Sequence, residues 1–363
     1  MKKWLRCAVL VLVAIVSGLT GAARACTYFF LKAKDGSVVS ARSQEFYSRL
    51  GAQLQMIPRG TAYVSEAPKD ARGLKWKSKY GVVAISALGQ KNLLVDAANE
   101  KGLYITTLWF ADVNYPDIKS GDAVVDLKNF VAWVAGNFAT VEELKAAMAR
   151  VKIYGQAEKD FNQGQVPPFH WPVTDAGGNS IVLEYLDGHL KIWDNRQNGV
   201  LTNEPNLGWH LEHLRFYSNL KAFAFPVPEL KDDRWSLGSD MKGLPGDYTN
   251  ASRFVRISAL KFFAKPPKDA DEALILGIHL INTVDIPYGP QIWIVGQEGL
   301  VQFTPWHSFF DHGNLRFYYR TYENPNLRQI NLKELNFQEG TPTKTVEIYG
   351  GSPFIDVTGA FKN

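Results

Sequence analysis

The first 26 residues of this chain place a cysteine directly after an export-type leader. Three basic residues precede an uninterrupted apolar run at residues 8–16, and residues 23–25 read Ala-Arg-Ala. A basic start, a short apolar run and a small-x-small triplet are typical of a secretory signal peptide, which is cut after the triplet. We therefore predict a signal peptide over residues 1–25, with Cys26 as the first residue of the mature chain.

The length of the leader argues against a retained membrane anchor. Its apolar run has nine residues, whereas a membrane-spanning helix needs about 20. We expect a signal peptidase to remove it, and we expect the mature protein to be periplasmic or secreted. Residues 26–363 show no composition break and no internal repeat, so we predict a single domain.

The net charge of +4 belongs to the leader. Residues 1–25 contain four of the 40 basic residues and none of the 36 acidic ones, so residues 26–363 carry 36 of each sign. A neutral chain without a basic block argues against nucleic acid and anionic membranes as partners. The balance favours a small-molecule or peptide substrate.

Cys26 is the one cysteine left once Cys7 departs with the leader, so it has no internal disulfide partner. It could be incidental, or it could be the acylated cysteine of a lipoprotein, a pattern with which Arg24 fits poorly. It could also pair with one of seven histidines, as in papain-like proteases. Residues 27–31, however, are β-branched and aromatic, which favours a strand where those proteases begin a helix. The remaining interpretation is an N-terminal nucleophile.

The N-terminal nucleophile has a direct chemical basis. A thiol attacks a carbonyl only as thiolate, and its unperturbed pKa of about 8.5 leaves it mostly protonated near neutral pH. A free α-amine titrates at about 7.7–8.0 and would lie within a few bonds of the sulfur. It could take the thiol proton and later return it to a leaving amine, so no separate histidine is needed.

A β-hairpin is predicted at the start of the mature chain. Residues 26–32 and 37–43 flank Asp35-Gly36, a dipeptide typical of a two-residue hairpin turn. The two strands would then lie side by side, with the cysteine at the open end.

This turn sets a predicted register. With a two-residue loop, Glu45 pairs with Cys26 and Arg42 pairs with Phe29. Arg42 and Glu45 are three residues apart, so a regular strand directs them to opposite faces. For both to reach the thiol, the strand must bulge or end near Ser43.

The rest of the chain predicts an α+β domain, because strands at both ends enclose helices. Thr140 and Glu143 form a capping box at the start of one helix, and residues 268–273 are predicted as a surface loop. No Gly-rich phosphate loop or metal-ligand spacing is present, so we predict neither cofactor nor metal. Strands are predicted at residues 81–85, 102–110, 180–185, 189–194, 291–295 and 300–303, and helices at residues 126–137, 140–150 and 250–265.

Five separated stretches carry a family resemblance. They are Cys26-Thr27 with Asp35-Gly36 and Ala41-Arg42; Asn99-Glu100-Lys101-Gly102-Leu103; Gly199-Val200-Leu201-Thr202-Asn203; Gly243-Leu244-Pro245-Gly246-Asp247; and Ala251-Ser252-Arg253-Phe254. In this order they resemble the choloylglycine hydrolases and penicillin V acylases, which are N-terminal nucleophile hydrolases. The resemblance runs from Cys26 to about Tyr322.

The resemblance implies a fold and a set of roles. The fold is a four-layer αββα sandwich. Cys26 matches the family nucleophile, and Arg42 matches the arginine beside the thiol. Asn203 matches the asparagine that helps to hold the oxyanion, and Arg253 matches the second arginine of the site.

Two positions depart from the family pattern. Glu45 stands where an aspartate usually contacts the terminal amine, so its carboxylate lies one methylene farther from the backbone. Trp109 stands where bile-salt hydrolases have asparagine and many penicillin acylases have tyrosine, which resembles the Gram-negative branch. Trp109 and Phe46 are predicted to line an apolar acyl pocket.

These features predict an exported hydrolase of N-acyl amides, acting on penicillin V or N-acyl homoserine lactones in preference to conjugated bile salts. One alternative is a lipid-anchored envelope binding protein that keeps the fold without catalysis. Another is an N-acyltransferase that uses the same acyl-enzyme. The sequence leaves the natural substrate and any homo-oligomer open.

Overall fold

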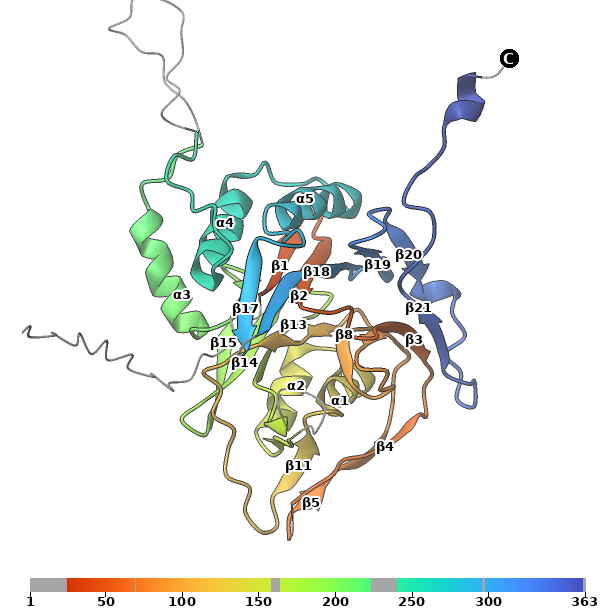
Figure 1. Cartoon of the computed structure of the whole chain (residues 1–363). Helices are drawn as coiled ribbons and strands as arrows, with labels where there is room; N and C mark the ends of the chain where they lie inside the picture. Colours follow the sequence, from red (N-terminus) through yellow and green to blue (C-terminus); the bar gives the residue numbers. More distant parts are fainter. Residues whose placement is uncertain (1–24, 69, 158–163, 223–239, 296–297, 362–363) are drawn as a thin grey trace, which may run out of the picture.

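A computed structural model describes residues 25–68, 70–157, 164–222, 240–295 and 298–361. Two large antiparallel sheets face each other, and each is covered on its outer side by helices (Figure 1). This four-layer arrangement confirms the predicted αββα fold. The predicted signal peptide, apart from Ala25, lies outside the described residues.

The seven-stranded sheet carries the start of the predicted mature chain. Its order is β16-β1-β2-β18-β19-β20, with β17 paired to β18. Helices α4 and α5 pack on β1 and β2. The bounds are β1 (Cys26–Lys32), β2 (Val38–Phe46), β16 (Val200–Leu201), β17 (Gln291–Val295), β18 (Glu298–Asp311), β19 (Arg316–Thr321), β20 (Arg328–Asn331), α4 (Asn250–Phe263) and α5 (Ala270–Asn282).

The nine-stranded sheet forms the other inner layer, in the order β15-β14-β13-β9-β8-β7-β3-β21, with β10 paired to β13. Helix α1 packs on β8 and β9, and α2 shares the core on that side. The bounds are β3 (Gln53–Ile57), β7 (Val82–Ser86), β8 (Leu94–Asn99), β9 (Tyr104–Thr106), β10 (Leu108–Trp109), β13 (Phe169–Thr174), β14 (Ser180–Leu186), β15 (His189–Asp194), β21 (Lys344–Glu347), α1 (Phe130–Asn137) and α2 (Val141–Met148).

Smaller elements surround this sandwich. Strands β12, β11 and β5 form a three-stranded sheet, and β4 pairs with β6. Among the described residues, no helix combines the length and apolar character that a membrane span requires. The bounds are β4 (Ala62–Val64), β5 (Arg72–Gly73), β6 (Lys75–Lys77), β11 (Ala123–Asp126), β12 (Lys152–Tyr154) and α3 (Leu207–Leu214), with 3₁₀ turns at Arg215–Tyr217, Leu332–Glu334 and Thr358–Phe361.

The predicted helices form, with corrected ends. The Thr140 hydroxyl accepts from the Glu143 N–H, which confirms the predicted cap, but the Glu143 carboxylate accepts from the Ala139 N–H, one residue before the Thr140 N–H that a capping box uses. Helix α1 begins at Phe130, because Asp126 ends β11 and residues 127–129 form a turn. The predicted loop at residues 268–273 is wrong: α5 begins inside it, where the Asp269 carboxylate caps the Glu272 N–H.

The predicted hairpin forms, but its register is wrong by one residue. Gln44, not Glu45, lies opposite Cys26. The loop has three residues, 34–36, and Gly36 closes it with φ +92° and an N–H bonded to the Ala33 carbonyl. Hairpins with three-residue loops commonly end the loop with a residue in the left-handed region, as Gly36 does here, whereas the prediction assumed a two-residue loop.

The shift changes which side chains share a face with the thiol. Strand β2 runs unbroken through Ser43, so the predicted bulge or end there is wrong. The irregularity lies in the neighbouring β18, between Phe303 and Trp306. Because side chains alternate along a strand, Gln44 is directed to the inter-sheet side with Cys26, and Glu45 to the α4 side.

Candidate active site

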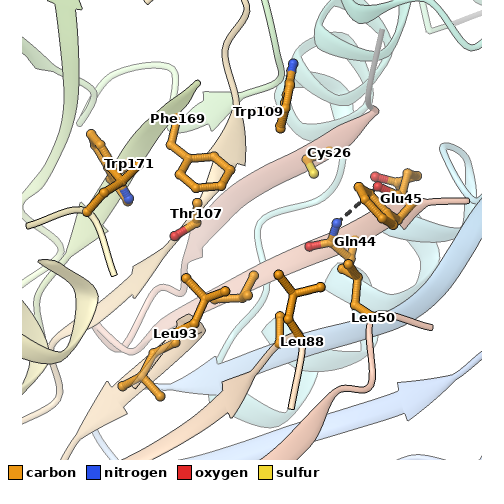
Figure 2. A pocket seen from close by; sticks show the side chains of 15 residues that line it. Cys26, Gln44, Glu45, Leu50, Leu88, Leu93, Thr107, Trp109, Phe169 and Trp171 are labelled. Carbon is orange, nitrogen blue, oxygen red and sulfur yellow. Dashed lines mark hydrogen bonds between the residues drawn. The ribbon is translucent and has the colours of Figure 1, made fainter. Parts of the chain in front are cut away.

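A pocket of about 600 Å³, including its open mouth, lies between the two sheets. Cys26 begins β1, and its sulfur points into this pocket (Figure 2). Trp109 and Phe46 both line it, and among the described residues no histidine does. The lining residues are mostly apolar: Cys26, Gln44, Glu45, Phe46, Leu50, Ala87, Leu88, Leu93, Leu94, Val95, Thr107, Trp109, Leu127, Phe169 and Trp171.

The Cys26 thiol is almost fully buried, with 2% of the residue exposed. Burial raises the pKa of this thiol above its ordinary value, although Arg42 acts in the opposite direction. Nη2 of Arg42 lies 3.8 Å from Sγ, and the Glu45 backbone N–H also bonds the sulfur. Because burial outweighs these favourable contacts, the thiol requires a proton acceptor before it can react as thiolate.

Arg42 is held by residues that the sequence did not single out. Its Nε lies 3.3 Å from Oδ1 of Asp96, and both side chains are fully buried. Nη2 donates to the Thr107 carbonyl at 3.0 Å and to the Gln44 side-chain oxygen. A charged residue inside the apolar strand β8 was the available signal for Asp96, because buried acidic side chains are rare unless paired.

Arg253 joins three segments around Cys26. It lies in the first turn of α4 and is fully buried. Nη1 donates to the Cys26 carbonyl at 2.6 Å and to Oγ1 of Thr27 at 2.7 Å. Nη2 donates to Oδ1 of Asn203 at 2.7 Å and to Oδ1 of Asn250 at 2.8 Å. Arg253 is therefore a buried, fully bonded residue and not an exposed surface arginine.

Asn203 contacts both the nitrogen of Cys26 and the pocket wall. Its Oδ1 accepts from the Cys26 backbone nitrogen at 2.7 Å. Its Nδ2 donates to the Trp109 carbonyl at 2.9 Å. Arg253 donates to the same Oδ1, so the orientation of the amide is determined by its partners. One of the two Nδ2 hydrogens serves Trp109, which leaves the second for another acceptor.

Glu45 lies beside this group on the α4 side of β2. It is fully buried, and its Oε1 accepts from Oγ1 of Thr304 at 3.1 Å. Burial raises the pKa of Glu45 to about 7, with Arg253 as the main opposing influence. Glu45 therefore contacts Cys26 through its backbone N–H, while Arg253 is the charged neighbour that acts most strongly on its carboxyl group.

The structure thus brings all seven predicted site residues into one region. Within the described part of the chain, no three His, Cys, Asp or Glu side chains are arranged to hold a metal ion. What the arrangement offers is a buried thiol, a nitrogen oriented on the same residue, two fixed cations and an apolar pocket. These are the components of an acyl-transfer site.

Comparisons with known proteins agree with this geometry. The model of the "Linear amide C-N hydrolases, choloylglycine hydrolase family" matches residues 26–346. A bile salt hydrolase/transferase of Clostridium perfringens is 31% identical over 330 residues, covering 88% of this chain and 96% of that protein. A penicillin V acylase of Pectobacterium atrosepticum is 28% identical over 317 residues, covering 82% and 78%.

Solved structures show the same relationship. A conjugated bile acid hydrolase variant from Clostridium perfringens superimposes with a TM-score of 0.77 at 28% identity, covering 92% of this chain and 99% of that one. A penicillin V acylase from Agrobacterium tumefaciens gives 0.72 at 26% identity, covering 89% and 91%. The chain therefore belongs to the choloylglycine hydrolase family of linear amide C–N hydrolases and has the fold of the N-terminal nucleophile hydrolases.

Proposed function

We propose that this hydrolase is exported, begins at Cys26 as a single domain, and cleaves N-acyl amides with the thiol and the α-amine of that residue. One observation carries the proposal: the Cys26 nitrogen is held 2.7 Å from Oδ1 of Asn203 while the sulfur of the same residue faces the apolar pocket. The leader pattern and a family match that begins at Cys26 support the predicted cleavage point.

The α-amine is the base in this proposal. Burial raises the thiol pKa, and none of the histidines that the structure describes lines the pocket. A freed amine with an ordinary pKa of about 7.7–8.0 is partly deprotonated near neutral pH. One of its N–H groups would remain on Asn203, which limits its rotation about the bond to Cα.

The reaction then proceeds in two halves. The amine takes the thiol proton, and the thiolate adds to the substrate carbonyl to form a C–S bond. The C–N bond breaks as the ammonium returns its proton to the leaving amine, which leaves a thioester on Cys26. A water molecule, deprotonated by the same amine, cleaves the thioester and releases a carboxylic acid.

Asn203 and Arg42 support the charged species. The second Nδ2 hydrogen of Asn203 is the side-chain donor for the oxyanion, together with backbone N–H groups. Arg42, 3.8 Å from Sγ, stabilises the thiolate. Arg253 holds the Cys26 carbonyl and Asn203 in their relative positions.

The pocket favours a flexible or flat acyl group. The rings of Trp109 and Phe169 pack edge to face, with their centroids 5.8 Å apart, and leucine side chains form the opposite wall (Figure 2). Apart from Cys26 and three polar residues, Gln44, Glu45 and Thr107, the lining is apolar. A phenoxyacetyl group or a fatty acyl chain needs few polar partners, whereas the hydroxyl groups of a bile acid need several. We therefore propose penicillin V or N-acyl homoserine lactones over conjugated bile salts.

The burial of Cys26 opposes the lipid-anchored alternative. A diacylglyceryl group on Sγ would have to enter the space between the two sheets, where the residue is 2% exposed. The transferase alternative uses the same thioester, and a relative is named a hydrolase/transferase. Adding an amine acceptor and analysing the products separates transfer from hydrolysis.

N-terminal sequencing and intact-mass analysis of the exported protein test the chemistry. We expect a chain that starts at an unmodified Cys26. A retained, shifted or acylated N-terminus would contradict the mechanism.

The substrate preference is tested separately, by comparing kcat/KM on penicillin V, an N-acyl homoserine lactone and a glycine-conjugated bile salt. We expect the first two to exceed the third. A preference for the bile salt would overturn the substrate assignment and leave the mechanism standing.

A further inference from the structure

The carboxylate of Asp96 is a fully buried acceptor that connects the two sheets. It lies on β8 of the nine-stranded sheet, and Oδ1 accepts from Oγ1 of Thr106 at 2.5 Å. From β18 of the seven-stranded sheet, Oδ2 accepts from Nε1 of Trp306 at 2.9 Å and from Oγ of Ser308 at 3.0 Å. Three uncharged donors therefore hold this carboxylate before Arg42 is considered.

Arg42 contacts this carboxylate with one hydrogen bond, from Nη1, and one further ion-pair contact, from Nε. Nε lies 3.3 Å from Oδ1 of Asp96, and Nη1 donates to Oδ2 at 3.3 Å. The remaining nitrogen, Nη2, is directed at Sγ of Cys26 and at the Thr107 carbonyl. The guanidinium is planar and rigid, so a hydrogen bond at Nη1 limits where Nη2 can lie. Asp96 thus restrains the guanidinium from one side, while the Thr107 carbonyl and the Gln44 side-chain oxygen hold Nη2 from the other.

We propose that Asp96 is a positioning residue for the nucleophile: it aims the Arg42 guanidinium at the Cys26 sulfur without touching the substrate itself. This inference rests on the proposed role of Cys26. Removing the Asp96 charge would leave the Arg42 guanidinium buried without its carboxylate, and the guanidinium would then move to find another acceptor. The thiolate would then lose its nearest fixed cation.

The test is the pH dependence of thiol alkylation. Iodoacetamide is reacted with Cys26 in the mature protein over a pH series, because alkylation follows the thiolate fraction. Asp96→Asn keeps the shape and removes the charge. We call the pH at which the alkylation rate is half-maximal the midpoint. We expect Asp96→Asn to raise this midpoint by about one pH unit, in the same direction as Arg42→Gln. It should also lower kcat by about 100-fold with little change in KM. Arg253, Glu45 and the α-amine also act on the thiol and are unchanged in these variants.

A double-mutant cycle separates positioning from general structure. If Asp96 acts through Arg42, Asp96→Asn adds no further midpoint shift to Arg42→Gln. Asp126→Asn is the matched control, because Asp126 is also buried and bonded, to the Glu66 N–H and Asn129. It should lower stability without moving the midpoint. An unchanged or lowered midpoint in folded Asp96→Asn, or additive shifts, would overturn the proposal.

Thr106→Val covers the case in which Asp96→Asn fails to fold. This near-isosteric change removes the 2.5 Å bond to Oδ1 and leaves both charges. We expect a smaller upward shift in the same direction, and no shift would count against the proposal. Alkylation reads the thiol directly, whereas failure of the proposed function would appear as absent turnover in the unaltered protein. The two outcomes are therefore distinguishable.

Discussion

The backbone nitrogen of Cys26 and Oδ1 of Asn203 lie 2.7 Å apart, although 177 positions separate them in the chain. The same oxygen accepts from Arg253, which also binds the Cys26 carbonyl. One amide and one guanidinium thus hold both backbone polar groups of the residue that carries the sulfur. Five predictions follow from this arrangement and its surroundings.

Replacing the sulfur tests the nucleophile. Cys26→Ala should abolish penicillin V hydrolysis, and Cys26→Ser should reduce kcat by a factor of about 10³ or more, because a hydroxyl is far harder to ionise than a thiol. Both variants should unfold at nearly the same temperature as the unaltered protein, since little volume changes. Substantial hydrolysis by purified Cys26→Ala would contradict the assignment.

Removing the Asn203 amide should affect the chemical step. Asn203→Ala eliminates the proposed oxyanion donor and the acceptor for the Cys26 nitrogen, so kcat should fall by about 10²–10³ with a small change in KM. Asn250→Ala is the control, because Asn250 contacts Arg253 but not the Cys26 nitrogen. Equal losses in the two variants would show that Asn203 has no special role.

Two arginines of α4 provide a matched comparison. Arg253→Ala should reduce kcat by about 100-fold and the free energy of unfolding by about 3–5 kcal/mol, because three buried acceptors and the half-buried Asn250 lose their donor. Arg256 instead donates to the carbonyls of Pro245, Thr283 and Asp247. Arg256→Ala should therefore lower stability while kcat stays close to normal. Steady-state kinetics and urea unfolding distinguish the two.

Glu45 should make stability depend on pH. Its pKa rises from 4.5 to about 7 on folding, so between these values the native state holds a proton that the unfolded chain has lost. Stability should therefore fall as pH rises through this window, by roughly 3 kcal/mol in all. Glu45→Gln should lose this dependence. Urea unfolding of both proteins at about pH 5 and about pH 8 measures the difference. The same change in the free energy of unfolding with pH in the unaltered protein and in Glu45→Gln would refute the prediction.

Trp109 should control affinity for the acyl group. Trp109→Ala removes apolar surface from the pocket, so KM for penicillin V should rise by about 10-fold or more, with a smaller effect on kcat. Trp209 lies on α3, is 43% exposed and is absent from the pocket lining. Trp209→Ala is therefore the control and should leave KM unchanged.

Part of the fold could be predicted because its signals lie within short stretches of sequence. Thr140 with Glu143 predicted a helix start that the structure confirms. The helix predicted at residues 250–265 likewise forms, as α4 over Asn250–Phe263. These patterns act within one or two turns, so the printed residues contain the information.

The hairpin register shows where such reasoning fails. Asp35-Gly36 suits both a two-residue and a three-residue loop, and the choice moves every side chain of β2 to the other face. The predicted partner of Cys26 was therefore Glu45, and the observed one is Gln44. In the structure, which has the three-residue loop, β2 also pairs with β18, more than 250 residues later in the chain.

The amino-acid sequence by itself predicted which groups form the proposed site: a cysteine after a leader-like segment, two arginines, an asparagine and an apolar aromatic pair. Only the tertiary structure decided their arrangement, including Asp96 behind Arg42 and Glu45 on the far face of β2. The reason is physical. Residue chemistry is a property of single positions, whereas burial and pairing depend on contacts between strands that are distant in the chain.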